Sequence, residues 1–405
     1  MPYSALARLD CSRCGQQYSA DQVHGTCECG SPLVARYDLE QVAGTVSPRD
    51  IAGRAPDLWR YHELLPVRSA QSVVTLGERM TPLLPMPRIG AALGVPRMLM
   101  KDEGTLPTGT FKARGAAVGV SRAAELGVTA IAMPTNGNAG AAWSAYGARA
   151  GMRSLIVMPS GSPPITQAEC TAAGAEVHLV DGDIGDAGAL VSRLVAERPG
   201  YVNVATLREP YRIEGKKTIG LEIAEQLGWR MPDVIVYPAG GGVGLIGIHK
   251  ALGELLELGW VTGDRPRLVA VQAAACAPVV AAFTAGARAC APWQAAGTAS
   301  SAAFGIMVPQ PLGDVLMLDA LYASGGTALA VSDTDLLSAQ REVAAAEGAL
   351  ICPESAACFA AVRELRAGGW LSEHDEVIVL STGTGLIYPQ TLVSAAAGPV
   401  HDPPQ

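Results

Sequence analysis

Short apolar strands alternate along most of this chain with alanine-rich stretches of helical length, and this alternation limits the fold more than any other feature. Nearly uninterrupted apolar runs occupy residues 130–134, 154–159, 234–238, 267–271 and 377–381. Strands that are apolar at almost every position are buried on both faces, as in a parallel sheet covered by helices. The sequence therefore predicts an α/β protein in which parallel strands lie between layers of helices.

Length and composition agree with such a fold and exclude several functions. The chain has 405 residues, of which 49% are hydrophobic and 17% charged, enough for about two or three packed domains. Its formal net charge of −8 argues against nucleic acid or an anionic membrane as a partner. The first residues have no apolar core of the kind found in signal peptides. Nine cysteines, an odd number, do not suit a full disulfide framework, so we expect a cytoplasmic protein.

One uncharged stretch, residues 268–286, nearly reaches the length of a membrane span. Gln272, Pro278 and Thr284 interrupt it, and it opens with Leu-Val-Ala-Val, which is typical of a strand. We therefore interpret it as a buried strand followed by a helix, and we predict no membrane contact.

Loops at the carboxyl ends of parallel strands are where such sheets bind ligands, and three of these loops carry suitable residues. In the first, residues 101–115, Lys112 stands just inside a predicted helix start, after a turn of Pro, Gly and Thr. Backbone N–H groups and the positive end of the helix dipole would lower the pKa of this amine. A deprotonated amine can form a Schiff base, whereas the alternative is an ordinary solvated lysine.

The second loop, residues 240–244, reads Gly-Gly-Gly-Val-Gly between a strand and a helix. Consecutive glycines there allow backbone N–H groups to converge on a phosphate. Gly242, Gly244 and Gly247 also match the dinucleotide pattern G-x-G-x-x-G. That fold needs an acidic residue at the end of the next strand, which here ends in Gln272. A phosphate cradle is favoured over a dinucleotide site, and a tight turn for helix packing remains the simplest alternative.

The third loop, residues 381–385, reads Ser-Thr-Gly-Thr-Gly after the last apolar strand. Its hydroxyl groups could hydrogen-bond a ring nitrogen or a phosphate. They could equally cap the last helix, because Ser and Thr are favoured at helix N-termini. This loop alone does not choose between the two interpretations.

Together these segments resemble the threonine synthases, pyridoxal-phosphate (PLP) enzymes of the tryptophan-synthase-β-like family. The likeness runs from about Leu58 to Pro389, and its motifs follow the family's order. They occupy residues 58–61, 76–83, 101–112, 135–140, 209–218, 238–247 and 380–386. The resemblance implies PLP fold type II, with two doubly wound parallel-sheet domains. It places a small α/β domain at 113–205, and a larger PLP-binding domain at 41–112 and 206–395.

The resemblance also assigns the residues that would hold the cofactor. Lys112 would form the Schiff base and act as the catalytic base. Asn138 would hydrogen-bond the phenolic oxygen of PLP. Thr382 would face the pyridine nitrogen, and a hydroxyl there would leave the ring largely unprotonated. The cofactor phosphate would be held by the main-chain N–H groups of Gly240, Gly241, Gly242, Val243 and Gly244.

A substrate site and a reaction are implied as well. The substrate α-carboxylate would be gripped by Thr135, Asn136, Gly137 and Ala139. Thr206 and Arg212 would bind a substrate phosphate, for which a guanidinium fork is well suited; a surface arginine is the alternative. The implied reaction turns O-phospho-L-homoserine and water into L-threonine and phosphate, by γ-elimination and β-addition of water. The resemblance further implies a homodimer.

Three residues depart from the family's pattern. Ala113 stands where these enzymes commonly carry Asp, Asn136 is atypical, and Met307 stands where an Arg is usual. The related amino-acid dehydratases accept small or apolar residues at the first of these positions. A missing arginine would weaken phosphate recognition. The alternative function is therefore PLP-dependent β-elimination or β-replacement, as in threonine or serine dehydratases or cysteate synthase.

The first 40 residues are interpreted as a small separate module rich in cysteine. Cys11, Cys14, Cys27 and Cys29 look like a zinc ribbon, because four thiolates can form a closed tetrahedral Zn²⁺ site. The second pair is C-x-C rather than C-x-x-C, so His24 could replace one ligand, and a metal-free or redox-labile hairpin is the alternative. A third hypothesis is an interaction protein with an inactive α/β body, which an intact Lys112 disfavours.

Overall fold

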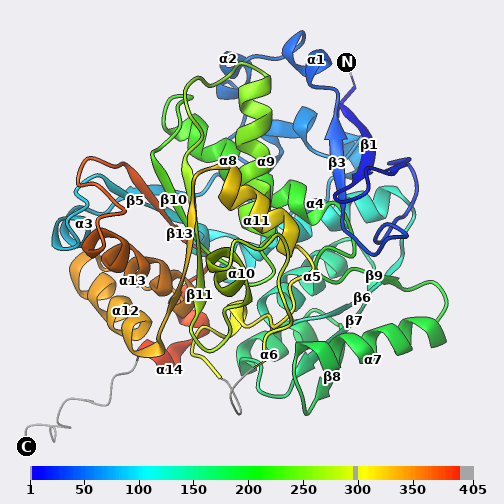
Figure 1. Ribbon diagram of the computed structural model, residues 1–405. Helices are drawn as coiled ribbons and strands as arrows, with labels where there is room; N and C mark the ends of the chain where they lie inside the picture. Colours follow the sequence, from blue (N-terminus) through cyan, green and yellow to red (C-terminus); the bar gives the residue numbers. More distant parts are fainter. Residues whose placement is uncertain (1, 295–299, 393–405) are drawn as a thin grey trace, which may run out of the picture.

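The computed structural model describes residues 2–294 and 300–392, whose strands form three sheets (Figure 1). The largest sheet has the strand order β12-β11-β10-β13-β5-β4. Its strands are β4 (Leu83–Pro85), β5 (Met98–Asp102), β10 (Val234–Pro238), β11 (Arg267–Ala273), β12 (Thr327–Val331) and β13 (Val377–Ser381). The four neighbouring pairs from β12 to β5 are parallel, as predicted.

The edge strand β4 is the exception, because it pairs antiparallel with β5. It is only three residues long and ends in Pro85. A proline cannot donate to a ladder, so this residue is tolerated at the edge of a sheet and not in its centre. The short α3 (Pro87–Ala92) returns the chain to β5.

A second, smaller sheet is parallel throughout and has the order β8-β7-β6-β9. Its strands are β6 (Ala130–Pro134), β7 (Arg153–Pro159), β8 (Glu176–Val180) and β9 (Val202–Asn203). All five apolar runs picked out in the sequence are strands in these two sheets, so that prediction is confirmed.

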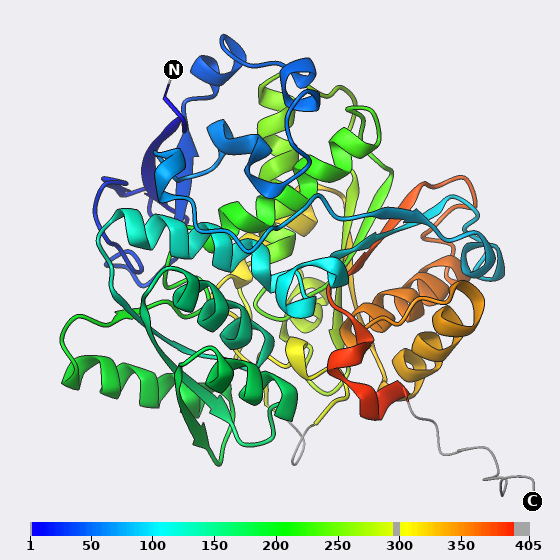
Figure 2. The same ribbon diagram turned by 180° about the vertical axis from the view of Figure 1, so that it is seen from behind.

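Helices cover both faces of the large sheet, and alternate strand residues face opposite layers. Val234 and Val236 belong to the hydrophobic cluster under one layer, whereas Ile235 and Tyr237 belong to the cluster under the other. The first layer contains α3, α12 (Asp333–Glu347) and α13 (Pro353–Ala367). The second contains α8 (Arg212–Gln226), α9 (Val243–Glu257), α10 (Pro278–Thr284) and α11 (Asp314–Ala323). Figures 1 and 2 show the two layers from opposite sides.

The small sheet is covered in the same way. Ile131 and Met133 of β6 pack with α4 (Lys112–Glu125) and α5 (Asn138–Arg149). Ala132 packs with α7 (Ile184–Glu197) on the opposite face. The helix α6 (Pro164–Ala172) lies beside α5, and its Cys170 joins the α4–α5 cluster.

The uncharged stretch 268–286 forms most of β11, followed by α10. The predicted strand and helix are therefore both present. Within residues 2–294 and 300–392, no helix has both the length and the apolar character that a membrane crossing requires.

The N-terminal residues form a third, antiparallel sheet of β1 (Leu6–Cys11), β2 (Gln17–Tyr18) and β3 (Leu33–Tyr37). Buried residues of this sheet share a hydrophobic cluster with α4 and α5. The carbonyl of Ala20 accepts hydrogen bonds from Arg122 and from the hydroxyl of Tyr211. The N-terminal sheet is therefore packed firmly against the small sheet's helices.

Short elements complete the chain. The α-helices are α1 (Leu39–Ala43), α2 (Pro48–Ala52) and α14 (Pro389–Leu392). The 3-10 helices are η1 (Leu58–Leu64), η2 (Ala70–Ser72), η3 (Glu103–Thr105), η4 (Pro107–Gly109), η5 (Phe304–Ile306) and η6 (Gly385–Ile387).

Candidate functional site

A cavity of about 450 Å³ lies where the loops after β6, β10 and β13 meet the start of α4. Every residue predicted to bind cofactor or substrate lines it, except Gly244. These residues are Lys112, Thr135, Asn136, Gly137, Asn138, Ala139, Thr206, Arg212, Gly240, Gly241, Gly242, Val243 and Thr382. Carboxyl-end loops of both parallel sheets thus converge on one site, as the topology of such sheets predicts.

Lys112 is the first residue of α4, as the sequence predicted. Its Nζ lies 4.5 Å from the centre of the Phe111 ring. Burial, and next the nearby charge of Arg212, lower the pKa of Lys112 to about 8. The sequence had assigned this effect to the helix dipole, whereas burial is the larger cause. An amine with this pKa is partly neutral at physiological pH and can act as a nucleophile or base.

The glycine loop forms the start of α9. Gly242 is its N-cap with φ +74°, and a Cβ there would lie 2.0 Å from Sδ of Met317. A Cβ on Gly244 would lie 2.3 Å from the Tyr237 hydroxyl, which explains why this glycine packs against the ring instead of lining the cavity. N–H groups in the first turn of a helix have no intrahelical acceptor and carry partial positive charge. The loop therefore presents an anion-binding helix start to the cavity.

Gln272 stands where a dinucleotide site would need an acidic residue, and it is fully buried near the end of β11. Its amide donates to the carbonyl of Ala239 at 3.0 Å and accepts from the N–H of Val279 at 2.8 Å. This side chain fastens the glycine loop to the start of α10. It does not present an acidic group to a ribose.

Thr382 ties the end of β13 to the lysine turn. Its carbonyl accepts the N–H of Phe111 at 2.9 Å, and its own N–H donates to the hydroxyl of Ser355 at 2.8 Å. The Thr382 side chain is buried against the cavity, with Sγ of Cys352 3.8 Å from its Oγ1. The predicted hydroxyl therefore sits in a rigid frame beside Lys112.

Asn138 begins α5 and belongs to a chain of hydrogen bonds that the sequence did not reveal. Its amide donates to the Tyr388 hydroxyl at 3.0 Å, which donates to Oε1 of Glu354 at 3.1 Å. The N–H of Gly305 donates to the same carboxylate oxygen at 2.8 Å. Burial, and next the charge of Glu354, raise the pKa of Tyr388 well above its ordinary value, so this hydroxyl stays protonated. Oδ1 of Asn138 is buried without a partner among the described residues.

Arg212, the first residue of α8, is 5% exposed, which excludes the surface arginine considered as its alternative. Its Nε lies 2.9 Å from Oε1 of Glu209, and its Nη1 lies 3.3 Å from Oγ1 of Thr206. The guanidinium carbon is 4.9 Å from the ring centre of Trp143. These contacts hold the planar fork in one orientation at the cavity wall.

The three residues that depart from the family's pattern take different positions. Ala113 is fully buried in the core beneath α4 and does not line the cavity. Met307 does not line the cavity either, but its carbonyl accepts the side-chain amide of Asn136 at 3.1 Å. The Asn136 side chain thus holds the 304–307 loop in place.

Comparison with known proteins gives a decisive match. Residues 74–383 match the model of a family described as pyridoxal-phosphate dependent enzymes. The chain belongs to this family.

Relatives of this PLP-dependent enzyme include two threonine synthases. The chain is 34% identical to that of Methanocaldococcus jannaschii over 391 residues, which cover 96% of this chain and 95% of the relative. It is 36% identical to that of Methanosarcina acetivorans over 396 residues, which cover 97% and 95%.

Solved structures of other PLP enzymes share the fold. Maize serine racemase superposes with a TM-score of 0.65 at 20% identity, covering 78% of this chain and 92% of that one. Diaminopropionate ammonia lyase from Escherichia coli superposes with a TM-score of 0.67 at 18% identity, covering 79% and 88%. At these identities the likeness concerns the fold alone, and the predicted fold type II is confirmed.

The cavity of this PLP-dependent enzyme fits the cofactor's chemistry in three respects. It contains an amine of lowered pKa, which suits an aldehyde. It contains a glycine-lined helix start, which suits a phosphate. It also contains Asn138, whose buried Oδ1 has no partner among the described residues, and the buried Thr382.

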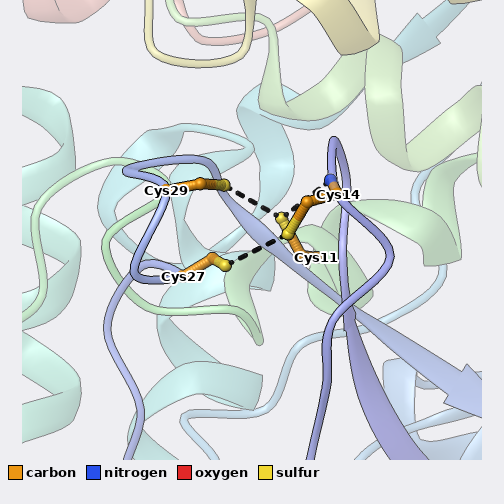
Figure 3. Close-up of side chains that lie close together, drawn as sticks. All are labelled: Cys11, Cys14, Cys27 and Cys29. Carbon is orange, nitrogen blue, oxygen red and sulfur yellow. Dashed lines mark hydrogen bonds between the residues drawn. The ribbon is translucent and has the colours of Figure 1, made fainter.

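The four N-terminal cysteines form a separate cluster, shown in Figure 3. Their sulfur atoms all lie within 4.8 Å of one another. Cys11 and Cys29 are 3.5 Å apart, and Cys14 and Cys27 are 3.6 Å apart. A tetrahedral Zn²⁺ with four thiolates places its sulfurs about 3.8 Å apart, so the cluster fits this ion.

Donors to sulfur and the place of His24 support the same interpretation. The N–H groups of Arg13 and Cys14 each donate to Sγ of Cys11 at 3.4 Å, and the Tyr18 hydroxyl donates to Sγ of Cys27 at 3.2 Å. Such donors orient metal ligands and stabilise their charge. His24 is not part of the cluster, because its ring contacts the carbonyl of Ser19 at 2.9 Å.

Proposed function

We propose that this chain is a threonine synthase, which converts O-phospho-L-homoserine and water into L-threonine and phosphate. The observation that carries the proposal is the cavity itself, which holds Lys112, the glycine-lined start of α9 and Arg212 together. The chain also aligns over nearly its full length with two threonine synthases. We propose the following roles for its residues.

Lys112 is the amine that would carry the cofactor, and the main-chain N–H groups of 240–244 would hold the cofactor phosphate. When bound, PLP supplies an electron-accepting ring that stabilises negative charge on the carbon next to the amino group. Asn138, oriented by Tyr388, would hydrogen-bond the phenolic oxygen. Thr382 would face the ring nitrogen with a hydroxyl in place of a charge.

The remaining cavity residues would orient the amino acid. The loop 135–139 would bind the α-carboxylate at the start of α5, where helix N–H groups favour an anion. Arg212 and Thr206 would hold the phosphate on the γ-carbon. Once freed, the amine of Lys112 would take the proton from Cα, and it would also move the proton at Cβ. A phosphate held beside Arg212 leaves as a stabilised anion, which favours γ-elimination over simple deamination.

The pH dependence of cofactor capture tests the role of Lys112. A lysine whose pKa lies near 8 becomes neutral, and therefore nucleophilic, as the pH rises through that value. We expect the rate at which PLP-free protein takes up PLP to rise from pH 6 to about 8 and then to level off. Stopped-flow absorbance measures this rate. A rise that continues toward the ordinary lysine pKa near 10.5 would argue against a buried, activated amine.

A substrate panel tests the reaction. Wild-type protein is expected to release phosphate from phosphohomoserine and to form threonine, with little ammonia released from threonine or serine. Arg212→Gln should raise KM for phosphohomoserine by about 10- to 100-fold, as expected for lost charge-assisted hydrogen bonds. Arg208→Gln, an exposed change two residues beyond Thr206, is the matched control and should change KM by less than twofold.

A different outcome would favour the alternative chemistry. Ammonia release from threonine that exceeds phosphate release from phosphohomoserine, with no dependence on Arg212, would favour a dehydratase. Product formation from phosphoserine would favour β-replacement.

We also propose that Cys11, Cys14, Cys27 and Cys29 bind one Zn²⁺. Purified protein is expected to contain about one zinc per chain by elemental analysis. Cys14→Ser should reduce this content to background, whereas Cys290→Ser, outside the cluster, should leave it unchanged. Metal-free protein whose four N-terminal thiols are oxidised in pairs would instead support the redox-labile hairpin.

We further propose a cytoplasmic homodimer, on the basis of the family resemblance. The proposed division into domains also stands as a prediction, with 1–40, 113–205 and the combined 41–112 and 206–395 as units. Its last residues, 393–395, lie outside the described part of the chain.

A further inference from the structure

Lys216 lines the cavity, although no role follows for it from the family resemblance. It is 3% exposed and lies on α8, one helical turn after Arg212. Residues four apart share a helix face, so both basic side chains reach the same part of the site. This spacing was visible in the sequence, and it is the signal that could have found Lys216.

The structure brings Lys216 close to the cofactor lysine. Its Nζ lies 4.0 Å from the centre of the Phe111 ring, while Nζ of Lys112 lies 4.5 Å from the centre of the same ring. Helices α4 and α8 cross so closely here that a Cβ on Gly215 would lie 2.0 Å from the carbonyl oxygen of Arg114. Gly115 leaves room for Cε of Lys216, which would lie 3.4 Å from a Cβ at that position.

The amine of Lys216 has one acceptor among the described residues, the carbonyl of Phe111. In its protonated form this group has three N–H donors, so two would remain for a group in the cavity. Of the five lysines in the chain, three pair with carboxylates: Lys101 with Glu222, Lys217 with Glu214, and Lys250 with Glu214 and Glu254. Among the described residues, Lys112 and Lys216 have no carboxylate within ion-pair distance.

Arg212 is in a different position, because Glu209 already balances its charge. A bound phosphate dianion would therefore meet an arginine that is paired, and a lysine that is not. Burial, and next the charge of Lys112, lower the pKa of Lys216 well below its ordinary value, because a buried cation without a counter-charge is costly. A phosphate bound beside Lys216 would supply that counter-charge and favour the ammonium form.

We propose that Lys216 binds the phosphate group of a phosphate monoester in this cavity, as a second cation beside Arg212. This inference rests on the proposed function, which supplies two such monoesters: the amino-acid substrate and the cofactor. The two share the same recognition chemistry, and the experiment below separates them.

Lys216→Gln removes the charge but keeps an amide that can donate to the Phe111 carbonyl. Lys216→Met is made in parallel. If Lys216→Gln does not fold, the apolar methionine side chain, which has a similar length, can fill the space where α4 and α8 cross. Circular dichroism and thermal melting establish that each full-length variant is folded. Arg208→Gln serves as the exposed control for loss of one positive charge.

Two binding measurements then test the role without relying on turnover. PLP-free protein is titrated with PLP and with pyridoxal, which lacks the phosphate, and PLP-loaded protein is titrated with inorganic phosphate. If Lys216 holds the substrate's phosphate, inorganic phosphate should bind about 10- to 100-fold more weakly while PLP affinity is unchanged. If it holds the cofactor's phosphate, the affinity for PLP should fall by a similar factor while the affinity for pyridoxal is unchanged.

Either pattern supports a phosphate-binding lysine. The proposal would be overturned if the affinities for both PLP and inorganic phosphate stayed within twofold of wild type. It would also be overturned if the affinities for PLP and pyridoxal fell equally. In either case Lys216 would have only a structural role. A failure of the proposed reaction would appear separately, as no phosphate release from phosphohomoserine by the wild-type protein.

Discussion

Replacing Lys112 by alanine is expected to reduce threonine formation by at least about 10³-fold, because the same side chain would hold the cofactor and move the substrate's protons. The variant should also lose the visible absorbance of lysine-bound PLP. Borohydride treatment of the wild-type protein, followed by peptide mapping, should place the pyridoxyl group on Lys112.

The chain has only five lysines, so few other side chains could carry the pyridoxyl group. Three of the five are tied to carboxylates in ion pairs. The real competitor is Lys216, which shares the Phe111 ring and the cavity with Lys112. Tryptic or chymotryptic peptides separate these two positions. A pyridoxyl group on Lys216, or none at all, would refute the assigned role of Lys112.

Lys216→Gln provides the matched control. It removes the other cavity lysine, and at a PLP concentration that saturates the variant it should leave the borohydride adduct on Lys112 intact. Loss of the adduct at saturating PLP would reverse the roles of the two residues.

The parts of the site that the sequence predicted are those encoded within one strand, loop and helix start. Lys112 and the glycines of 240–244 belong to continuous motifs, and the carboxyl edge of a parallel sheet brings such loops together. The antiparallel β4 escaped prediction because a three-residue strand carries too little pattern to show its direction.

The missed residues depend on packing between distant segments. Glu354 and Tyr388 were missed, and they form one hydrogen-bonded chain with the predicted Asn138 although the three are widely separated in sequence. Nothing in the pattern around Glu354 distinguishes it from an ordinary first-turn acidic residue of α13. The cause of the lowered pKa of Lys112 was missed for the same reason, since burial depends on the whole cavity.

A buried ion network behind the lysine helix carries the second large prediction. Arg114 lies two residues after Lys112 and is fully buried. Its Nε is 2.6 Å from Oε2 of Glu103, and its Nη1 is 2.5 Å from Oε1 of Glu222. Nζ of Lys101 lies 2.7 Å from Oε2 of Glu222, and Oγ1 of Thr81 donates to Oε1 of Glu103 at 2.7 Å. The network joins β5, η3, α4 and α8 beneath the active site.

Arg114→Met is expected to lower the free energy of unfolding by about 3–5 kcal/mol, because it leaves two buried carboxylates with one cation. Although burial opposes ionisation, Arg114 and Lys101 lower the pKa of Glu222 to about 2. Its contribution to stability is therefore complete above its ordinary pKa of 4.5 and is lost as the pH falls toward 2. Urea unfolding of PLP-free protein at pH 7 and pH 4 measures both effects.

Two further variants show whether charge balance is the cause. Arg363→Met breaks an ion pair with Glu342 in which both side chains are about two-fifths exposed, and it should cost no more than about 1 kcal/mol. Arg114→Met combined with Glu222→Leu leaves Lys101 and Glu103 in balance, so it should recover part of the stability lost in the single variant. If the free energy of unfolding of Arg114→Met lies within about 1 kcal/mol of the wild-type value, the buried charges are compensated in another way. If the double variant is less stable than the single one, shape at the helix crossing, and not charge, determines the stability of the region beneath Lys112.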